Sequence, residues 1–195
     1  DTPSSRGLGD VYKRQGSGPL IILFHSTASS LNQWHSLINL LKNEYEIIAV
    51  NLFGYGLTSK WIENNNPQNL LDHVKLTEPF INSDKGKITF IGHSFGGSVA
   101  MRAALEFQIK LNKLILLEPN AFFILNNKDH TYAYNIANNF GKEINEAKIN
   151  SNWKDFAKIF LEFWIGKGTW EKMKPEQKQK FLKVIPNIYY EAQSI

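Results

Sequence analysis

The 195-residue sequence contains no cysteine, which excludes a disulfide scaffold and a zinc site with cysteine ligands. It has no apolar run of about 18 residues, the length that a transmembrane helix needs. The other residues, 43% apolar and 21% charged, are ordinary for a globular chain and exclude a disordered or collagen-like one. The length fits one domain. The absence of cysteine also fits a reducing compartment, so we expect a cytoplasmic protein.

The net charge of +4 does not form a cluster of one sign. Residues 16–119 hold eight basic and eight acidic side chains, and the excess comes mainly from the eleven basic and eight acidic side chains of residues 120–195. There the lysines between 172 and 183 alternate with Glu171 and Glu176, which is typical of a solvated helix face. A nucleic-acid surface would need a basic cluster with stacking aromatic residues, so we expect no such partner.

Residues 1–15, DTPSSRGLGDVYKRQ, have no hydrophobic periodicity and no starting methionine. The stretch SSRGLGDVYKRQ resembles a translated adapter sequence at the head of fragmentary predicted proteins. We therefore interpret residues 1–15 as a non-native leader and expect them to add no element to the fold. A native flexible arm is the alternative. With an adapter leader the native N-terminus is missing, and the sequence does not test for a signal peptide.

Short apolar runs and amphipathic stretches alternate through residues 16–120. The apolar runs predict four strands, at residues 19–24, 46–50, 87–91 and 113–117, and the first two have the pattern of buried strands. Helical spacing predicts helices over residues 31–42, 68–82 and 98–107. This alternation builds β-α-β units, so it predicts a partial doubly wound, mostly parallel α/β sheet. From residue 121 to 195 no strand run occurs, and the spacing predicts an all-helical segment.

The motif Gly92–His93–Ser94–Phe95–Gly96–Gly97 is a G-x-S-x-G sequence directly after a predicted strand and directly before a predicted helix. This context predicts a nucleophile elbow, a turn so sharp that Ser94 takes a strained backbone conformation. Side chains at positions 92 and 96 would crowd the turn, so both are expected to require glycine. The alternative is a glycine-rich β-α turn without chemistry.

A second candidate element, His25–Ser26–Thr27, follows the first buried strand. In a doubly wound sheet this strand lies beside the third, so the loop after Phe24 should face Ser94. The backbone N–H of Thr27, or alternatively of Ser26, and that of Phe95 at a helix N-terminus would then form an oxyanion hole. We interpret His25 as a structural hydrogen-bonding residue rather than a catalytic base.

Four segments, LIILFHSTASSLNQW, YEIIAVNLFGYGLTS, KITFIGHSFGGSVA and KLILLEPN, resemble consecutive strand-end motifs of the α/β-hydrolase family, in family order over residues 19–120. Residues 121–190 resemble that family's helical cap. The resemblance implies that Ser94 is the nucleophile and that Phe95 and Thr27 are the oxyanion donors. It implies hydrolysis of an ester, thioester or related small acyl substrate through an acyl-enzyme, with no metal and no cofactor. Serine at the elbow argues against a haloalkane dehalogenase or an epoxide hydrolase.

The same resemblance implies an apolar acyl pocket. The residues expected to shape it are Leu52 and Phe53 from a loop of the core and Phe122, Phe160 and Trp164 from the cap.

The sequence departs from the family pattern at three places. Ser26 stands where the family usually has glycine, which permits a backbone conformation that serine resists, so we expect the oxyanion geometry to differ there. Asn51 stands where the family often has aspartate, and this change should alter loop anchoring rather than chemistry. The family's acid and histidine follow the cap, whereas the one histidine after Ser94 is His130, which we interpret as a surface residue. Glu118 is interpreted as a strand-terminating carboxylate. We therefore expect the terminal strands to be absent and the triad to be incomplete. A ligand-binding protein without turnover is the alternative function.

Overall fold

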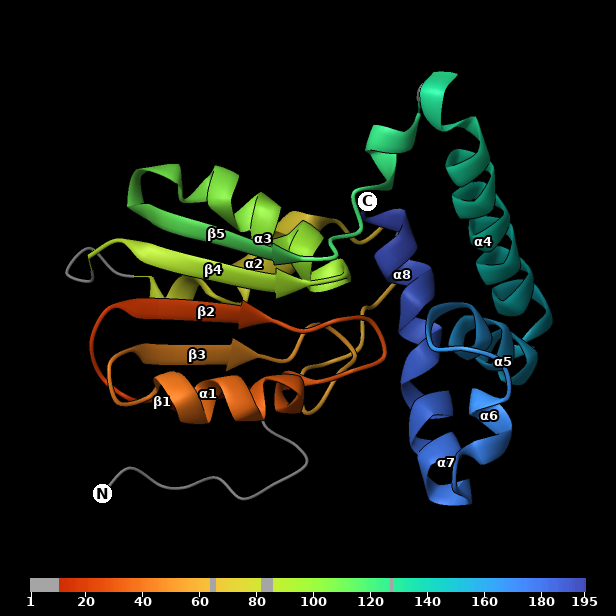
Figure 1. The fold of residues 1–195 in the computed structure, drawn as a ribbon, viewed down its shortest axis with the longest axis horizontal. Coiled ribbons are helices and arrows are strands. Elements are labelled where there is room, and N and C mark those ends of the chain that lie inside the picture. The colour runs from red at the N-terminus through yellow and green to blue at the C-terminus, as the bar shows by residue number, and fades with distance from the viewer. Residues whose placement is uncertain (1–10, 64–65, 82–85, 127) are drawn as a thin grey trace.

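The computed structural model describes residues 11–63, 66–81, 86–126 and 128–195. Its centre is a five-stranded sheet in the order β1-β3-β2-β4-β5 (Figure 1). The strands are β1 (Tyr12–Gln15), β2 (Leu20–Phe24), β3 (Glu46–Val50), β4 (Ile88–His93) and β5 (Leu111–Leu117). Strands β2 to β5 are parallel to their neighbours, and β1 is antiparallel to β3. The predicted α/β class with a mostly parallel sheet is therefore confirmed.

Strand β1 is an element that the sequence analysis omitted. Tyr12–Gln15 pairs with residues 47–50 of β3, and Arg14 forms an ion pair of 2.6 Å with Glu46. The expectation that residues 1–15 add no element is therefore wrong for residues 12–15, while residues 1–10 lie outside the described residues. The strand gave no apolar signal because it is an edge strand whose side chains alternate between exposed and half-buried.

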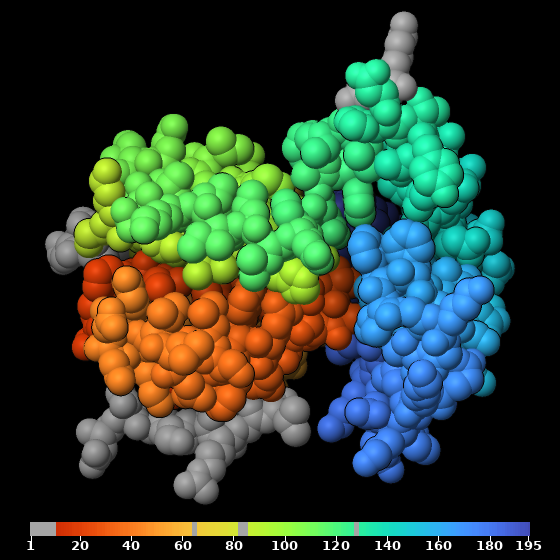
Figure 2. Space-filling view, viewed as in Figure 1, coloured from red at the N-terminus to blue at the C-terminus, as the bar shows by residue number. Residues whose placement is uncertain are grey.

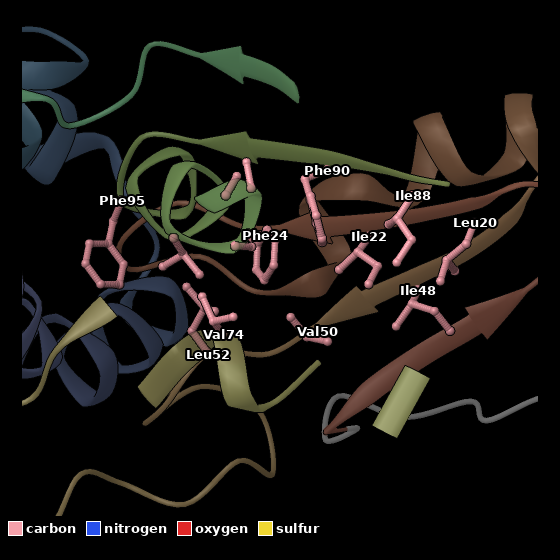
Figure 3. Close-up of a cluster of buried hydrophobic side chains, with 14 of the residues drawn as sticks. Leu20, Ile22, Phe24, Ile48, Val50, Leu52, Val74, Ile88, Phe90 and Phe95 are labelled. Carbon is pink, nitrogen blue, oxygen red and sulfur yellow. The ribbon is translucent and has the colours of Figure 1, made fainter. Parts of the chain in front are cut away.

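Helices cover both faces of the sheet, which is why the central strands are apolar throughout. On one face, α1 (His35–Leu41), entered through the 3-10 helix η1 (Leu31–Trp34), packs on Ile21, Leu23 and Ile47. On the other, α2 (Leu70–Lys75) and α3 (Phe95–Glu106) enclose the cluster in Figure 3, which includes Phe24 and Phe90.

Strand β2 pairs with β4, with Phe24 opposite Gly92, as the doubly wound order predicts. The loops that leave these two strands therefore start from the same edge of the sheet. Two short 3-10 helices complete the core, η2 (Glu78–Phe80) and η3 (Gln108–Lys110).

Residues 121–195, here called the helical segment, contain no strand among their described residues. The segment comprises η4 (Phe122–Leu125), η5 (Lys128–His130), α4 (Thr131–Asn150), α5 (Trp153–Trp164), α6 (Thr169–Lys172), α7 (Pro175–Val184), η6 (Ile185–Asn187) and α8 (Ile188–Gln193). It has its own buried cluster around Phe156 and Leu161 and lies beyond the carboxyl ends of the parallel strands (Figures 1 and 2). None of the helices in the described ranges is both long and apolar enough to span a bilayer.

Candidate active site

Ser94 forms the turn between β4 and α3 with φ 54° and ψ −121°. A positive φ is costly for any residue with a Cβ atom, so this serine is held in the strained conformation that the elbow motif predicts. Its N–H donates to the carbonyl of Leu117 on β5 at 2.9 Å, and its carbonyl accepts from the N–H of Gly97 at 2.8 Å. These bonds fix the backbone on both sides of the serine.

The elbow glycines are required by close backbone approaches. A Cβ atom on Gly92 would collide with the carbonyl oxygen of Gly96, and one on Gly96 would collide with the carbonyl oxygens of Phe24 and His25. A Cβ on Gly97 would lie 2.8 Å from the Cβ of Pro119. The glycines thus let the turn, β2 and the loop after β5 come together.

The hydroxyl of Ser94 donates to Oδ1 of Asn120 at 3.2 Å. Asn120 is itself fixed to the elbow, because its N–H donates to the carbonyl of Ser94 at 3.2 Å and its carbonyl accepts from the hydroxyl of Ser98 at 2.9 Å. A carboxamide is not a base at neutral pH. Among the described residues, no histidine bonds the Ser94 hydroxyl. Asn120 was missed, although its place after a strand end could have marked it.

The loop after β2 offers Thr27 rather than Ser26 as a donor. The N–H of Ser26 already bonds Oε1 of Gln33 at 3.1 Å, and the side-chain amide of Gln33 donates to Nδ1 of His93 at 3.1 Å. The N–H of Thr27 has no hydrogen-bond partner among the described residues. The left-handed conformation of this loop is taken by Ala28, with φ 56°, and not by Ser26, so serine at position 26 does not strain it.

His25 is a buried structural residue. Its Nδ1–H donates to the carbonyl of Ser26 at 2.8 Å, and its Nε2 accepts from the N–H of Leu52 at 3.1 Å. Burial lowers the pKa of the imidazole to about 4, so the ring is neutral at pH 7. The interpretation of His25 as a structural hydrogen-bonding residue is confirmed. Asn51 likewise anchors a loop, because its Oδ1 accepts from the N–H of Leu31 at 2.8 Å.

Glu191 on α8 is a site residue that the sequence analysis missed. Its carboxyl group accepts from the hydroxyl of Thr27 at 2.5 Å and from that of Tyr55 at 2.6 Å. Tyr55 in turn accepts from the N–H of Ala28 at 3.0 Å. The side chain is 2% exposed, and burial raises the pKa of the carboxyl to about 7. Glu191 and Tyr55 therefore tie the helical segment to the loop that carries Thr27.

A cavity of about 400 Å³ lies between the strand-end loops and the helical segment, and Ser94 is in its lining. Of the predicted site residues, Ser26, Thr27, Phe95, Phe122, Phe160 and Trp164 also line it. Phe140 and Phe181 line it too and were missed, although they share the helical spacing of the other aromatic residues.

Other predicted residues lie elsewhere. Leu52 is fully buried in the core, and the ring of Phe53 packs on Trp61 and His73, so neither lines the cavity. His130 is exposed and away from it, whereas Glu118, with φ 45°, does line it. No group of acidic or histidine side chains in the described residues has the arrangement of a metal site.

A sequence profile of the alpha/beta hydrolase fold matches residues 19–157, more than half of the chain, and the chain belongs to this family. Two curated relatives are a 2-hydroxy-6-oxo-6-(2'-aminophenyl)hexa-2,4-dienoic acid hydrolase of Metapseudomonas resinovorans, 25% identical, and a pimeloyl-[acyl-carrier protein] methyl ester esterase of Legionella pneumophila, 29% identical. These alignments cover 75% and 78% of this chain and 56% and 62% of the relatives' own lengths.

The fold is also shared with solved structures. A hydrolase of Oleispira antarctica superposes with a TM-score of 0.68 at 16% identity, covering 94% of this chain and 68% of that one. At this identity the likeness shows the fold alone, and the site residues are argued from the geometry above.

Proposed function

We propose that this chain carries the nucleophile and oxyanion hole of a serine hydrolase that cleaves an ester, thioester or related acyl compound. The observation that carries the proposal is Ser94, held at φ 54° on a strand–helix elbow and lining a cavity shared with Thr27 and Phe95. The relatives named above are a hydrolase and an ester-cleaving enzyme, which supports hydrolysis. The helical segment acts as the cap.

The proposed reaction begins when Ser94 Oγ attacks the substrate carbonyl carbon and passes its proton to a base. The oxyanion accepts hydrogen bonds from the N–H groups of Thr27 and Phe95. Phe95 is the first residue of α3, so its N–H has no carbonyl partner within the helix and the helix dipole favours an anion there. One such donor contributes about 2.7–4 kcal/mol to transition-state binding. The tetrahedral intermediate then expels the alcohol or thiol, and water hydrolyses the acyl-enzyme.

The bond from Ser94 to Asn120 leads us to expect slow turnover by residues 1–195, because a serine hydroxyl is a weak nucleophile without an adjacent base. The test is to assay the purified chain on p-nitrophenyl acetate and butyrate beside Ser94→Ala. We expect turnover below about 1 s⁻¹. Faster turnover that disappears in the variant would show a complete triad, and His93 would then be the first candidate base.

The same bond favours a second candidate function, a protein that holds its ligand in the cavity without turnover. Such a protein would bind esters reversibly and release them uncleaved. Ser94→Ala would then leave the dissociation rate of the ester unchanged. The hydrolase proposal requires a covalent bond to Ser94 at some step.

A further inference from the structure

The ionisable side chains that line the cavity are acidic apart from one histidine. Glu191 and Glu118 are in the lining, and none of the described lining residues is lysine or arginine. We propose that the cavity accepts an uncharged, apolar acyl group and excludes one that carries a carboxylate, with Glu191 as the specificity-determining residue. This inference rests on the proposed function in one respect, that the cavity is the acyl site.

Part of the cavity wall is built from aromatic side chains of the helical segment. The ring of Phe160 on α5 lies 6.0 Å from that of Phe140 on α4, 6.0 Å from that of Phe181 on α7 and 6.5 Å from that of Trp164, and all four line the cavity. Apolar walls with few polar groups are typical of small-ligand sites. An alkyl or aromatic acyl chain would bury its surface here.

Glu191 has no cation as a partner among the described residues. Its two partners are the hydroxyls of Thr27 and Tyr55, and both donate their hydrogen to the carboxylate. Lys148 on α4, whose ammonium lies 5.0 Å from the ring centre of Tyr190, bonds the carboxylate of Glu63 and the hydroxyl of Tyr190 instead. A buried charge without a counter-ion acts on neighbouring charges with little screening, so Glu191 repels an anion in the cavity at pH values above its pKa of about 7.

A carboxylate on the acyl chain would therefore lose its water and gain no partner. The hydroxyls of Thr27 and Tyr55 are already used by Glu191, and Glu118 adds the same sign at the exposed side of the cavity. Burying a charge without pairing it is strongly unfavourable. A neutral acyl chain has no charge to desolvate and is not repelled by the glutamates. Its reacting carbonyl can still accept hydrogen bonds from the N–H groups of Thr27 and Phe95.

The experiment measures binding rather than turnover, so that it does not depend on the nucleophile. Three ligands are titrated into the Ser94→Ala chain at pH 8.5 by ligand-observed NMR: methyl hexanoate, its ω-carboxylate and its ω-carboxamide. We expect the carboxylate to bind at least about tenfold more weakly than methyl hexanoate, because Glu191 repels it. The carboxamide, of equal size, should lie between them.

Glu191→Gln in the same background identifies the residue, since glutamine removes the charge while its amide oxygen accepts from one of the two hydroxyls and its amide nitrogen donates to the other. It should strengthen binding of the carboxylate several-fold relative to that of methyl hexanoate. Glu143→Gln, an exposed site on α4 outside the cavity, changes the net charge equally and should do neither. Equal binding of carboxylate and carboxamide, or no binding of the neutral ester, would overturn the proposal, and an unchanged ratio in Glu191→Gln would overturn the role of Glu191. Failure of the proposed function is measured separately, as the absence of an adduct on Ser94 after the wild-type chain is treated with a fluorophosphonate.

Discussion

At the scale of single residues, three of the described residues with a strained backbone lie just after the carboxyl ends of parallel strands. Ala28, Ser94 and Glu118 have φ values of 56°, 54° and 45°, and they follow β2, β4 and β5 respectively. All three line the cavity. Strained conformations persist only where the surroundings enforce them, and they are common at functional sites. The fourth such residue described, Ser151, has an ordinary cause, because it ends helix α4 in the left-handed conformation typical of helix C-termini.

The raised pKa of Glu191 gives a testable dependence of stability on pH. The folded protein holds this proton up to a pH of about 7, whereas the unfolded chain releases it near 4.5. The contribution of Glu191 to the free energy of unfolding is therefore fully present below about pH 4.5 and is lost as the pH rises to about 7. From 1.36 kcal/mol per pKa unit, the loss is about 3 kcal/mol.

The measurement is urea unfolding of the wild type and of Glu191→Gln at several pH values from 4.5 to 8.5. The wild type should lose unfolding free energy relative to the variant as the pH rises to about 7. Above that pH the difference between the two should stay constant. Taking the difference removes the opposite effect of His25, whose lowered pKa destabilises the fold as the pH falls. A difference that is constant with pH would show that Glu191 titrates normally.

At the scale of elements, β2 and β3 could be predicted because both of their faces are buried, which makes each a nearly unbroken apolar run. The apolar runs in β4 and β5 also predicted strands, although most of β5 is exposed. Helix α3 begins at Phe95, three residues before the predicted start at residue 98, because Gly96 and Gly97 carry no apolar periodicity. Strand β1 could not be predicted, since an edge strand with one half-buried face needs little apolar character.

The candidate site, too, could be predicted from the sequence only in part. That Ser94, Phe95 and Thr27 lie together in the cavity lining could be predicted, because each follows a strand end in a short, ordered motif. Glu191 and Tyr55 could not, since their hydrogen bond joins positions 136 residues apart and depends on how the helical segment docks. Leu52 has the apolar character of a pocket residue, but its backbone is used by His25 and its side chain by the core.

The elbow glycines yield a prediction at this scale. Gly96→Ala should destabilise the fold by about 3 kcal/mol or more, because the new Cβ would meet the backbone carbonyls of Phe24 and His25, which are not free to move. Gly141→Ala is the matched control. It lies inside α4 with nothing within 4 Å of a new Cβ, and it should stabilise by about 0.5–1 kcal/mol. Denaturant unfolding compares the two, and equal stability would contradict the packing described for the elbow.

At the scale of the whole molecule, the sheet ends in an apolar edge. Strand β5 is the last in the strand order, and Leu114, Ile115 and Leu117 are 36%, 40% and 44% exposed. Strand β5 corresponds to the fourth strand predicted from the sequence, at residues 113–117. A long exposed edge of this kind can pair with another chain.

We therefore predict that residues 1–195 self-associate through β5 at micromolar to millimolar concentrations. Replacing both Ile115 and Leu117 by lysine should lower the association seen by light scattering, since charge on an edge strand opposes strand pairing. Ile149→Lys, on α4 and 79% exposed, adds a lysine at an apolar surface position away from the sheet and should have little effect. If Ile149→Lys lowers association as much as the β5 variant, the edge is not the contact.

The central claim is that Ser94 is a nucleophile beside an oxyanion hole formed by Thr27 and Phe95. The most direct test is a crystal structure of the protein after prolonged incubation with an excess of a fluorophosphonate, since oxyanion donors and binding alone still accelerate such chemistry by about 10³–10⁴ over water. The account predicts phosphorus bonded to Ser94 Oγ, with its oxygen about 2.7–3.1 Å from the backbone nitrogens of Thr27 and Phe95. An adduct on a different serine, or one on Ser94 whose oxygen points away from both nitrogens, would contradict it.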